Sequence, residues 1–247
     1  QVAIAVPLIV MSAMSLDRFR ATATSNLGFE AELLYAAPLK VAPDAAARAG
    51  FQIRSVRDSV EKADGVASAT VADGLPLDFR DRGAMVSLQV DANVAPRLFP
   101  VQVTRVSDEY LGTMGIPVLR GRGFTVDDGA GAEMVTVISK PLADKLFPDA
   151  DAAGGVGKRL VFGADPQSQQ TLTIVGVTAD FPTTQMSTER EQLLLPLAQH
   201  PSPNLFVVAR SAPGEPATKV TAALENAIRD LGPEFSRDLS YADGLQF

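Results

Sequence analysis

Two stretches with helical periodicity, one near each end of the chain, constrain the fold more than any other feature of the sequence. The first spans residues 45–63, with Asp44 as a suitable N-cap and Asp64-Gly65 as a suitable stop. Strand-like runs at 30–36 and 66–71 flank it, so the segment predicts a β–α–β unit of about 45 residues. Its apolar positions are Phe51, Ile53, Val56 and Val60.

The C-terminal end predicts a second unit of the same kind. The run NLFVVA at 204–209 is typical of a buried strand, and residues 216–231 carry a 3.6-residue apolar stripe. A turn is expected at Pro213-Gly214 and a helix stop at Gly232-Pro233. Residues 236–241 are expected to form the returning strand. The similarity between the two units is architectural, because their residues do not repeat.

The middle of the chain is rich in short apolar runs separated by Gly and Pro. These runs predict many strands and few helices. Strands are expected at 85–90, 101–106, 135–138, 160–162, 172–177 and 193–195, and short helices at 108–114 and 140–147.

This order of elements predicts an α+β fold in which one domain, built from both chain ends, is interrupted by an inserted one. The base is expected to comprise residues 26–97 and 196–247, and the β-rich insertion residues 98–195. The strands at 66–71 and 205–208 then share one sheet despite roughly 135 intervening residues, since loop-closure cost grows only logarithmically with length. The insertion is expected to have a core of its own. Its predicted members are Val135, Val137, Ile174, Val175 and Val177.

The N-terminal stretch from Val2 to Leu16 has no charged residue and is followed by Asp17 and Arg18. A signal peptide is disfavoured, because no basic n-region precedes the apolar run. Two interpretations stay open: a buried core helix, and the outer part of a membrane helix, whose full span needs about 20 apolar residues. The charged exit favours the second, so residues 1–25 are expected to be the end of a first transmembrane helix or its extension.

Composition excludes several classes of partner and chemistry. The 247 residues include 22 Lys and Arg against 29 Asp and Glu, a net charge of −7. An acidic chain without a basic stripe is a poor binder of nucleic acid, since phosphate contacts supply most of that affinity. There is no cysteine, which excludes disulfides, thiol nucleophiles and Cys-ligated metals.

A single histidine, His200, limits the catalytic options. It cannot form a His-rich metal site, and the chain has no Gly-x-Ser-x-Gly nucleophile elbow. The neighbouring Pro201 and Pro203 indicate a loop, so His200 is expected to be a plain surface or loop residue. We therefore predict that the domain is not an enzyme, and we expect no catalytic, cofactor-binding or metal-binding residues and no cofactor.

The glycine-rich and acidic motifs also predict structure rather than chemistry. Residues 154–158 (GGVGK) resemble a phosphate loop, but Arg159 stands where a Ser or Thr must reach magnesium. The Gly121–Gly123 motif lacks the third glycine of a dinucleotide fingerprint. The carboxylates Asp127-Asp128 and Asp180 are expected in turns. No calcium-loop spacing surrounds the two remaining acidic candidates, Asp149 and Asp151.

Four motifs in the chain resemble those of MacB-like and FtsX-like ABC transporter permeases. The first is DEYLGTMGIPVLRGRGF at 108–124, with Tyr110, a Gly-Ile-Pro turn at 115–117 and a glycine-rich close at 121–124. The others are VTVISKPLADKLFPDADAAGGVGKRL (135–160), LTIVGVTAD (172–180) and LPLAQ (195–199). The sequence departs from the family at Ala152–Gly155, which are extra residues, and at Leu194, where an aromatic residue is common.

The resemblance implies a porter-like base of two β–α–β units with an inserted β-rich, Sabre-like subdomain between the first two of four membrane helices. It implies a place on the periplasmic side of the bacterial inner membrane. The partners implied are a cytoplasmic ABC ATPase, a second permease copy, the membrane through flanking helices, and a periplasmic adaptor or lipoprotein. Within the domain, Arg122 is expected to form a structural ion pair.

Two functions are compatible with that resemblance. In the first, the domain couples cytoplasmic ATP hydrolysis to a periplasmic conformational change for efflux or extraction of a substrate. In the second, it is a docking module for an adaptor protein, a lipoprotein or a cell-wall enzyme and transmits no force.

Overall fold

The computed structural model describes residues 33–42, 45, 50–76, 82–88, 97–148, 154–181, 191–229, 231, 235–237 and 245–246. The apolar N-terminal run, Asp149, Asp151 and the end of the predicted strand at 236–241 lie outside the described residues.

The predicted N-terminal β–α–β unit is present. It consists of β1 (Leu34–Val41), α2 (Gly50–Glu61) and β2 (Val66–Ala72). The helix was expected from residue 45, but Ala45 lies in a turn, and the expected N-cap Asp44 lies outside the described residues. Its end is as predicted: Gly65 has φ +84°, the left-handed conformation that a glycine adopts at little cost.

The C-terminal unit consists of β10 (Asn204–Ser211), α5 (Ala217–Arg229) and β11 (Phe235–Arg237). Both the strand and the helix agree with their predicted positions. A further short strand, β12 (Leu245–Gln246), pairs with β1 and had no signal in the sequence.

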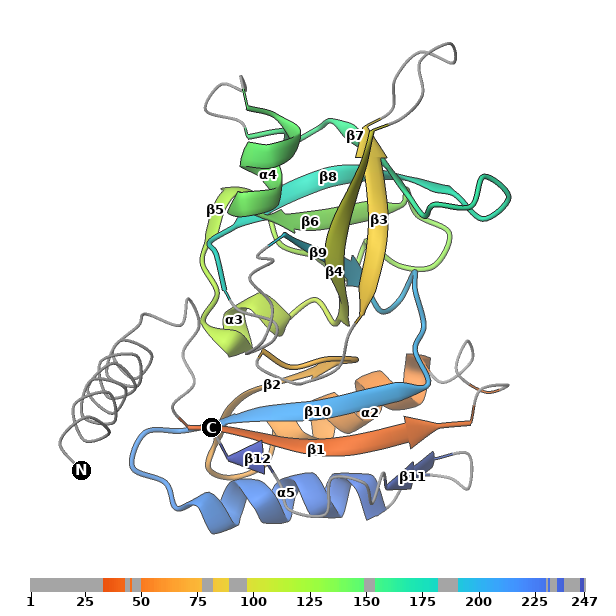
Figure 1. Ribbon diagram of the computed structural model, residues 1–247. Helices are drawn as coiled ribbons and strands as arrows, with labels where there is room; N and C mark the ends of the chain where they lie inside the picture. Colours follow the sequence, from red (N-terminus) through yellow and green to blue (C-terminus); the bar gives the residue numbers. More distant parts are fainter. Residues whose placement is uncertain are drawn as a thin grey trace, which may run out of the picture.

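The two units interlock in one sheet with the strand order β11-β1-β10-β2. β10 runs antiparallel to both β1 and β2, and β11 runs antiparallel to β1. Each unit therefore places a strand between the two strands of the other, which is a split β–α–β arrangement. The predicted pairing of the terminal segments is confirmed, since Val71 lies opposite Val207 in the sheet. We call this sheet with α2 and α5 the base (Figure 1).

Both faces of the base sheet are buried. Alternate residues of β10 point to opposite sides: Leu205, Val207 and Ala209 pack in the core with α2 and α5, whereas Phe206 and Val208 pack on the other side. This explains why NLFVVA is apolar without alternation, as strands covered on both faces are.

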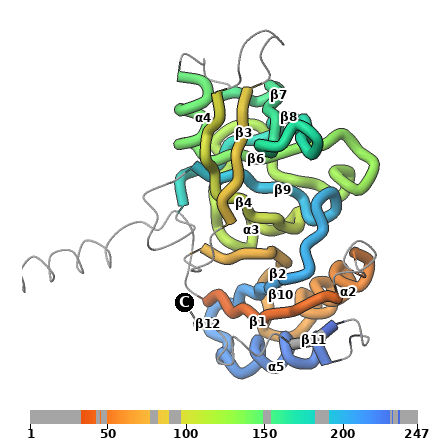
Figure 2. The backbone as a smooth tube through the Cα atoms, turned by 45° about the vertical axis from the view of Figure 1, so that its right-hand side comes forward, coloured from red at the N-terminus to blue at the C-terminus, as the bar shows by residue number. Residues whose placement is uncertain are grey.

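Above the base lies a ring of six strands, which we call the barrel (Figures 1 and 2). The order is β4-β3-β7-β8-β6-β9, and β9 closes the ring by pairing in parallel with β4. The strands are β3 (Gly83–Leu88), β4 (Leu98–Val106), β6 (Val135–Ser139), β7 (Arg159–Phe162), β8 (Gln170–Thr178) and β9 (Gln192–Pro196). Strand β5 (Val118–Gly121) and helices α3 (Tyr110–Met114) and α4 (Lys140–Leu146) complete this region.

The barrel differs from the sequence prediction in two respects. Strand β3 lies in the stretch expected for the base, yet its partners are β4 and β7 of the barrel. The five residues predicted to form one inserted core divide between two cores. Val135, Val137 and Val175 face the base, whereas Ile174 and Val177 belong to the barrel interior. The prediction that this region has a core of its own is confirmed, but three of its five predicted members were wrong. Neighbouring residues of β6 and β8 point to opposite sides of the barrel wall, so Val135, Val137 and Val175 lie outside that core.

Candidate functional site

A hydrophobic core shared by the base and the barrel is the central feature of the junction between them. From the base it takes Leu34 and Phe206, both about 1% exposed, and from β6 it takes Val135. Helix α3 lies between the two regions (Figure 1) and contributes Tyr110 and Met114, at 1% and 0% exposure. Base and barrel are thus joined by continuous packing, the arrangement expected of a single rigid body.

The geometry of α3 comes from the Gly-Ile-Pro turn that follows it. Gly115 caps the helix with φ +67°, and its N–H donates to the carbonyl of Gly112. The N–H of Ile116 donates to the carbonyl of Leu111 at 2.8 Å, so the two bonds satisfy helix-end carbonyls. The turn then directs Ile116, 4% exposed, into the shared core.

Ion pairs border the same junction. Asp73, after β2, accepts hydrogen bonds from the backbone N–H of Arg105 at 2.7 Å and from its Nη1 at 2.8 Å. The Asp73 side chain is 4% exposed, so its carboxylate is shielded from water, whereas the Arg105 side chain is 32% exposed. Arg57 of α2 pairs with Glu109 and lies 3.5 Å from Asp108, in the segment between β4 and α3. The first pair links the base to β4 of the barrel, and the second links α2 to the segment between β4 and α3.

Two hydrogen bonds add to these links. The hydroxyls of Thr70 in β2 and Ser107 lie 2.7 Å apart. Arg210 of β10 donates from Nε to the carbonyl of Thr113 in α3 at 2.8 Å.

The Gly-Arg-Gly segment after β5 forms the structural ion pair predicted for it. Arg122 donates to both carboxylate oxygens of Asp128, at 2.7 and 2.9 Å, and Asp128 also accepts from the backbone N–H of Thr125. The hydrogen bond from Arg122 lowers the pKa of Asp128. Gly121 is required here, because it has φ +67° and a Cβ would lie 2.2 Å from the carbonyl oxygen of Val175.

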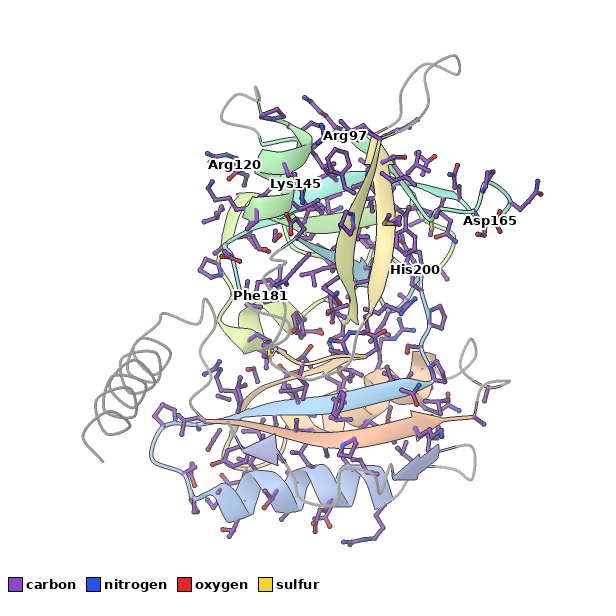
Figure 3. The ribbon with its side chains drawn as sticks, viewed as in Figure 1. Arg97, Arg120, Lys145, Asp165, Phe181 and His200 are labelled. Atoms are coloured by element: carbon purple, nitrogen blue, oxygen red, sulfur yellow. The ribbon has the colours of Figure 1, made fainter. Side chains whose placement is uncertain are left out.

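The LPLAQ segment connects the barrel to the base. The Gln199 side chain accepts from the backbone N–H of Val135 at 3.1 Å and donates to the carbonyl of Glu133 at 2.8 Å. His200 follows it in the connection to β10 (Figure 3). It lies in a loop, as predicted, but it is only 9% exposed, so the expectation of a surface residue was wrong.

The burial of His200 has an electrostatic consequence. Its ring makes an edge contact with Phe162, with centroids 6.3 Å apart. Burial lowers its pKa to about 4, and the positive charge of Arg105 adds to the effect. Sequence reasoning missed this because the flanking prolines indicate a loop and carry no information about what covers it.

The remaining candidates are dispersed. Residues 154–158 form the predicted turn, in which the N–H of Gly157 donates to Ile174 and the Lys158 ammonium lies 4.6 Å from the Phe147 ring centre. Asp127 is exposed and its neighbour Asp128 buried, so the two carboxylates do not face a common site. Asp180 follows β8. Within the described part of the chain, no three His, Cys, Asp or Glu residues gather as they do around a metal ion.

An apolar groove opens beside the junction. It has a cavity of about 110 Å³ between the start of α2, the segment after β4, the loop 124–128 and the β9–β10 connection. Phe51, in the first turn of α2, is 75% exposed, and Val126 at the groove is 79% exposed. The helical pattern had assigned Phe51 to the core face with Ile53, which was wrong, since Val56 and Val60 are the buried residues of α2.

The family model described as MacB-like periplasmic core domain matches residues 2–227. The chain belongs to this family. No curated protein matches the sequence. Among solved structures, the periplasmic region of MacB from Actinobacillus actinomycetemcomitans is similar, with 14% identity, a TM-score of 0.54, and coverage of 86% of this chain and 91% of that chain. A domain of a protein described as a permease from Porphyromonas gingivalis has 19% identity, a TM-score of 0.53, and coverage of 89% and 93%.

Membership of the MacB-like periplasmic core domain family confirms the resemblance seen in the four motifs. The chain is a periplasmic domain of a MacB-like ABC transporter permease, located outside the cytoplasm, with a mixed α+β fold in which strands dominate. Among the described residues, no helix has the length and apolarity to cross a bilayer.

Proposed function

We propose that this MacB-like domain transmits force in its permease. A cytoplasmic ABC ATPase subunit or domain hydrolyses ATP, the membrane helices move, and the domain passes that movement to the periplasm for efflux or extraction of a substrate. In this proposal the permease lies in the bacterial inner membrane and functions as two copies, and a periplasmic adaptor or lipoprotein receives the movement.

The shared core is the observation that carries this proposal. A domain can transmit movement only if its parts do not yield against each other. Phe206 of the base and Tyr110 of α3 are buried in one continuous core with Val137 of the barrel wall. Packed interiors have low compressibility and transmit strain, so a displacement of the base moves the barrel with it.

The strand pairing at the edge of the base supports the same proposal. Tyr35 and Ala36, at the start of β1, lie opposite Gln246 and Leu245 of β12. The first and last described strands are therefore neighbours in the sheet (Figure 1). Membrane helices that precede β1 and follow β12 would act on the base at one place, as a lever requires.

The proposal assigns no catalysis to the domain. The junction consists of apolar packing, paired charges and backbone hydrogen bonds. Acid–base or nucleophilic chemistry requires reactive groups that converge on one position, and the candidates at His200, Asp128 and Lys158 lie on separate elements with partners of their own or in buried surroundings.

Spin-label distances in the full permease test the proposal, and this domain contributes no cysteine that would compete with the introduced labels. Asp165→Cys labels an exposed turn of the barrel and Ala222→Cys an exposed position on α5. With the ATPase present, we expect nucleotide to change the distances between labels on the two copies. The Asp165–Ala222 distance within one copy, measured with an excess of unlabelled permease, is expected to stay constant.

A barrel-to-barrel distance that is the same with and without nucleotide would contradict the proposal. That result would favour the second candidate, a docking module that transmits no force. The apolar groove beside the junction is the observation that favours this second function.

A further inference from the structure

The groove beside the junction has features of a binding site that force transmission does not use. Its walls are mostly apolar and come from the two regions and their connections. They include Ile53, Phe124, Val126, Leu197, Ala198 and Pro201. The atoms that line an apolar cavity lack van der Waals contacts on the cavity side until a ligand fills it.

The charged groups at the groove are unequal in their pairing. Asp108 lies 3.5 Å from Arg57, and Asp128 is held by two hydrogen bonds from Arg122. Arg54 also lines the groove and is exposed, and it makes no ion pair with any residue that the structure describes. Arg57 is shared among Asp108, Glu109 and Asp58, so Asp108 keeps part of its negative charge. The exposed guanidinium of Arg54 is the group at the groove that can pair with a carboxylate of a ligand.

Two exposed apolar side chains extend the surface beyond the cavity. Phe51 and Val126 are the two most exposed of the large hydrophobic side chains in the described part of the chain, at 75% and 79%. Single exposed hydrophobics are ordinary. Here, however, Val126 is part of the groove wall and Phe51 lies in the same helical turn as Arg54, so apolar surface, cavity and charge adjoin.

We propose that this groove binds a segment of a partner protein through one apolar side chain and one carboxylate. The apolar side chain enters the cavity, and an Asp or Glu of the same segment pairs with Arg54. Size favours a side chain over a lipid. The cavity of about 110 Å³ is smaller than the roughly 150 Å³ cavity that accommodates benzene in an engineered protein core, so it can enclose one small aliphatic side chain but only a short part of an acyl chain.

The expected energetics are those of a small hot spot. A central buried anchor dominates such interfaces, and the surrounding contacts exclude water. The carboxylate–Arg54 pair lies at the rim, where it mainly sets partner choice and association rate. This inference goes beyond the proposed function and does not depend on it, since binding can be measured without ATP.

Photo-crosslinking in cells that express the full permease tests the proposal. A benzophenone amino acid replaces Phe51 or Val126, and Leu119, an exposed apolar residue of β5, serves as the control position. We expect mass spectrometry to find the same segment of one other protein at Phe51 and Val126 but not at Leu119. That segment should contain an apolar residue beside an Asp or Glu.

Charge reversal then tests the role of Arg54. Arg54→Glu is expected to abolish the adduct, while Arg229→Glu, at an exposed arginine of α5, preserves it. A synthetic peptide of the crosslinked segment should bind the Arg54→Glu permease at least tenfold more weakly, provided that both variants melt at the wild-type temperature. Adducts to lipid alone, to a second copy of the chain alone, to a protein regardless of Arg54→Glu, or to nothing would each overturn the proposal.

Discussion

The base and the barrel both consist of buried strands, but they close their sheets in different ways. The barrel is a ring of six strands in which every strand has two neighbours, so its walls have no open edge of the kind that invites aggregation. The base is an open sheet assembled from segments as distant as β1 and β12. The comparison suggests a division of roles: the barrel is held by its own pairing, whereas the base depends on both ends of the chain.

The connection between the two regions relies on side chains rather than strands. Between β2 of the base and β4 of the barrel, the described ladder holds a single residue pair, Ala72 opposite Val106. One backbone hydrogen bond flanks this pair on each side, from Asp73 to Arg105 at 2.9 Å and from Ser107 to Val71 at 2.8 Å. A ladder of this length is weak by itself. The shared core and the Asp73–Arg105 pair must therefore supply most of the rigidity at the junction.

The largest expected effect tests whether the two regions unfold as one. Phe206→Ala removes a ring that is 1% exposed from the shared core. We expect it to lower the free energy of unfolding by about 3–5 kcal/mol, the range for deletion of a buried aromatic side chain. Denaturant unfolding should retain a single transition at a lower midpoint.

Phe51→Ala is the matched control, because the same side chain is removed from a position that is 75% exposed. It should change stability by less than about 0.5 kcal/mol. Two separate transitions in the Phe206→Ala variant would mean that base and barrel fold independently and that the shared core does not couple their unfolding.

A smaller effect is expected from the ion pair at the junction. Asp73→Ala leaves the guanidinium and the backbone N–H of Arg105 without their carboxylate. Since the Arg105 side chain is 32% exposed, water compensates in part, and we expect a loss of about 1–3 kcal/mol. The comparison is Asp64→Ala, which removes an ion pair with Lys219 on the base surface. Exposed ion pairs contribute little to folding stability, so Asp64→Ala should lower the melting temperature less than Asp73→Ala. Equal decreases for the two variants would show that the junction pair stabilises the fold no more than a surface pair does.

The sequence predicted the base better than the barrel. The helical stripes and the apolar run at 204–209 give the base elements directly, and β2 and β10 pair as expected. Periodicity indicates which residues of one element share a face. In the base, the apolar faces of α2 and α5 pack against one side of the sheet to form a core. The start of α2 was placed at residue 45 because Asp44 is a suitable N-cap, yet Ala45 lies in a turn.

The barrel and its junction were harder to predict. Ring closure depends on β9 pairing in parallel with β4, a contact between strands that are almost ninety residues apart and have no distinguishing pattern. The division of Val135 and Ile174 between two cores follows from this closure. One sequence motif indicated the shared core indirectly. The Gly-Ile-Pro turn at 115–117 ends α3 and places Ile116 in that core.

The pH dependence of stability tests the connection between barrel and base. His200 is neutral in the folded protein, with a pKa lowered to about 4, while the unfolded chain takes up a proton near its ordinary value of 6.5. Between these values the unfolded state binds more protons, so stability present above pH 6.5 is lost as the pH falls towards 4. We expect a loss of roughly 1–3 kcal/mol over this window.

His200→Gln removes the titrating group at the same position and should flatten the profile between pH 6.5 and 4. Chemical denaturation at half-unit intervals of pH measures both proteins. Parallel profiles would show that His200 is not the group responsible and that its surroundings admit water in solution.

The smallest expected effect, none at all, concerns the barrel turn at 154–158. A phosphate loop needs backbone N–H groups that point to the ligand. Here the N–H of Gly157 donates to Ile174, the N–H of Lys158 donates to Gly155, and the Lys158 ammonium lies over the Phe147 ring. Millimolar Mg-ATP should therefore leave the melting temperature of the domain unchanged, since only a ligand that binds the native state raises it. A saturable rise that disappears in Lys158→Ala would assign nucleotide binding to this turn, and the barrel would then be a sensor as well as a rigid body moved by the base.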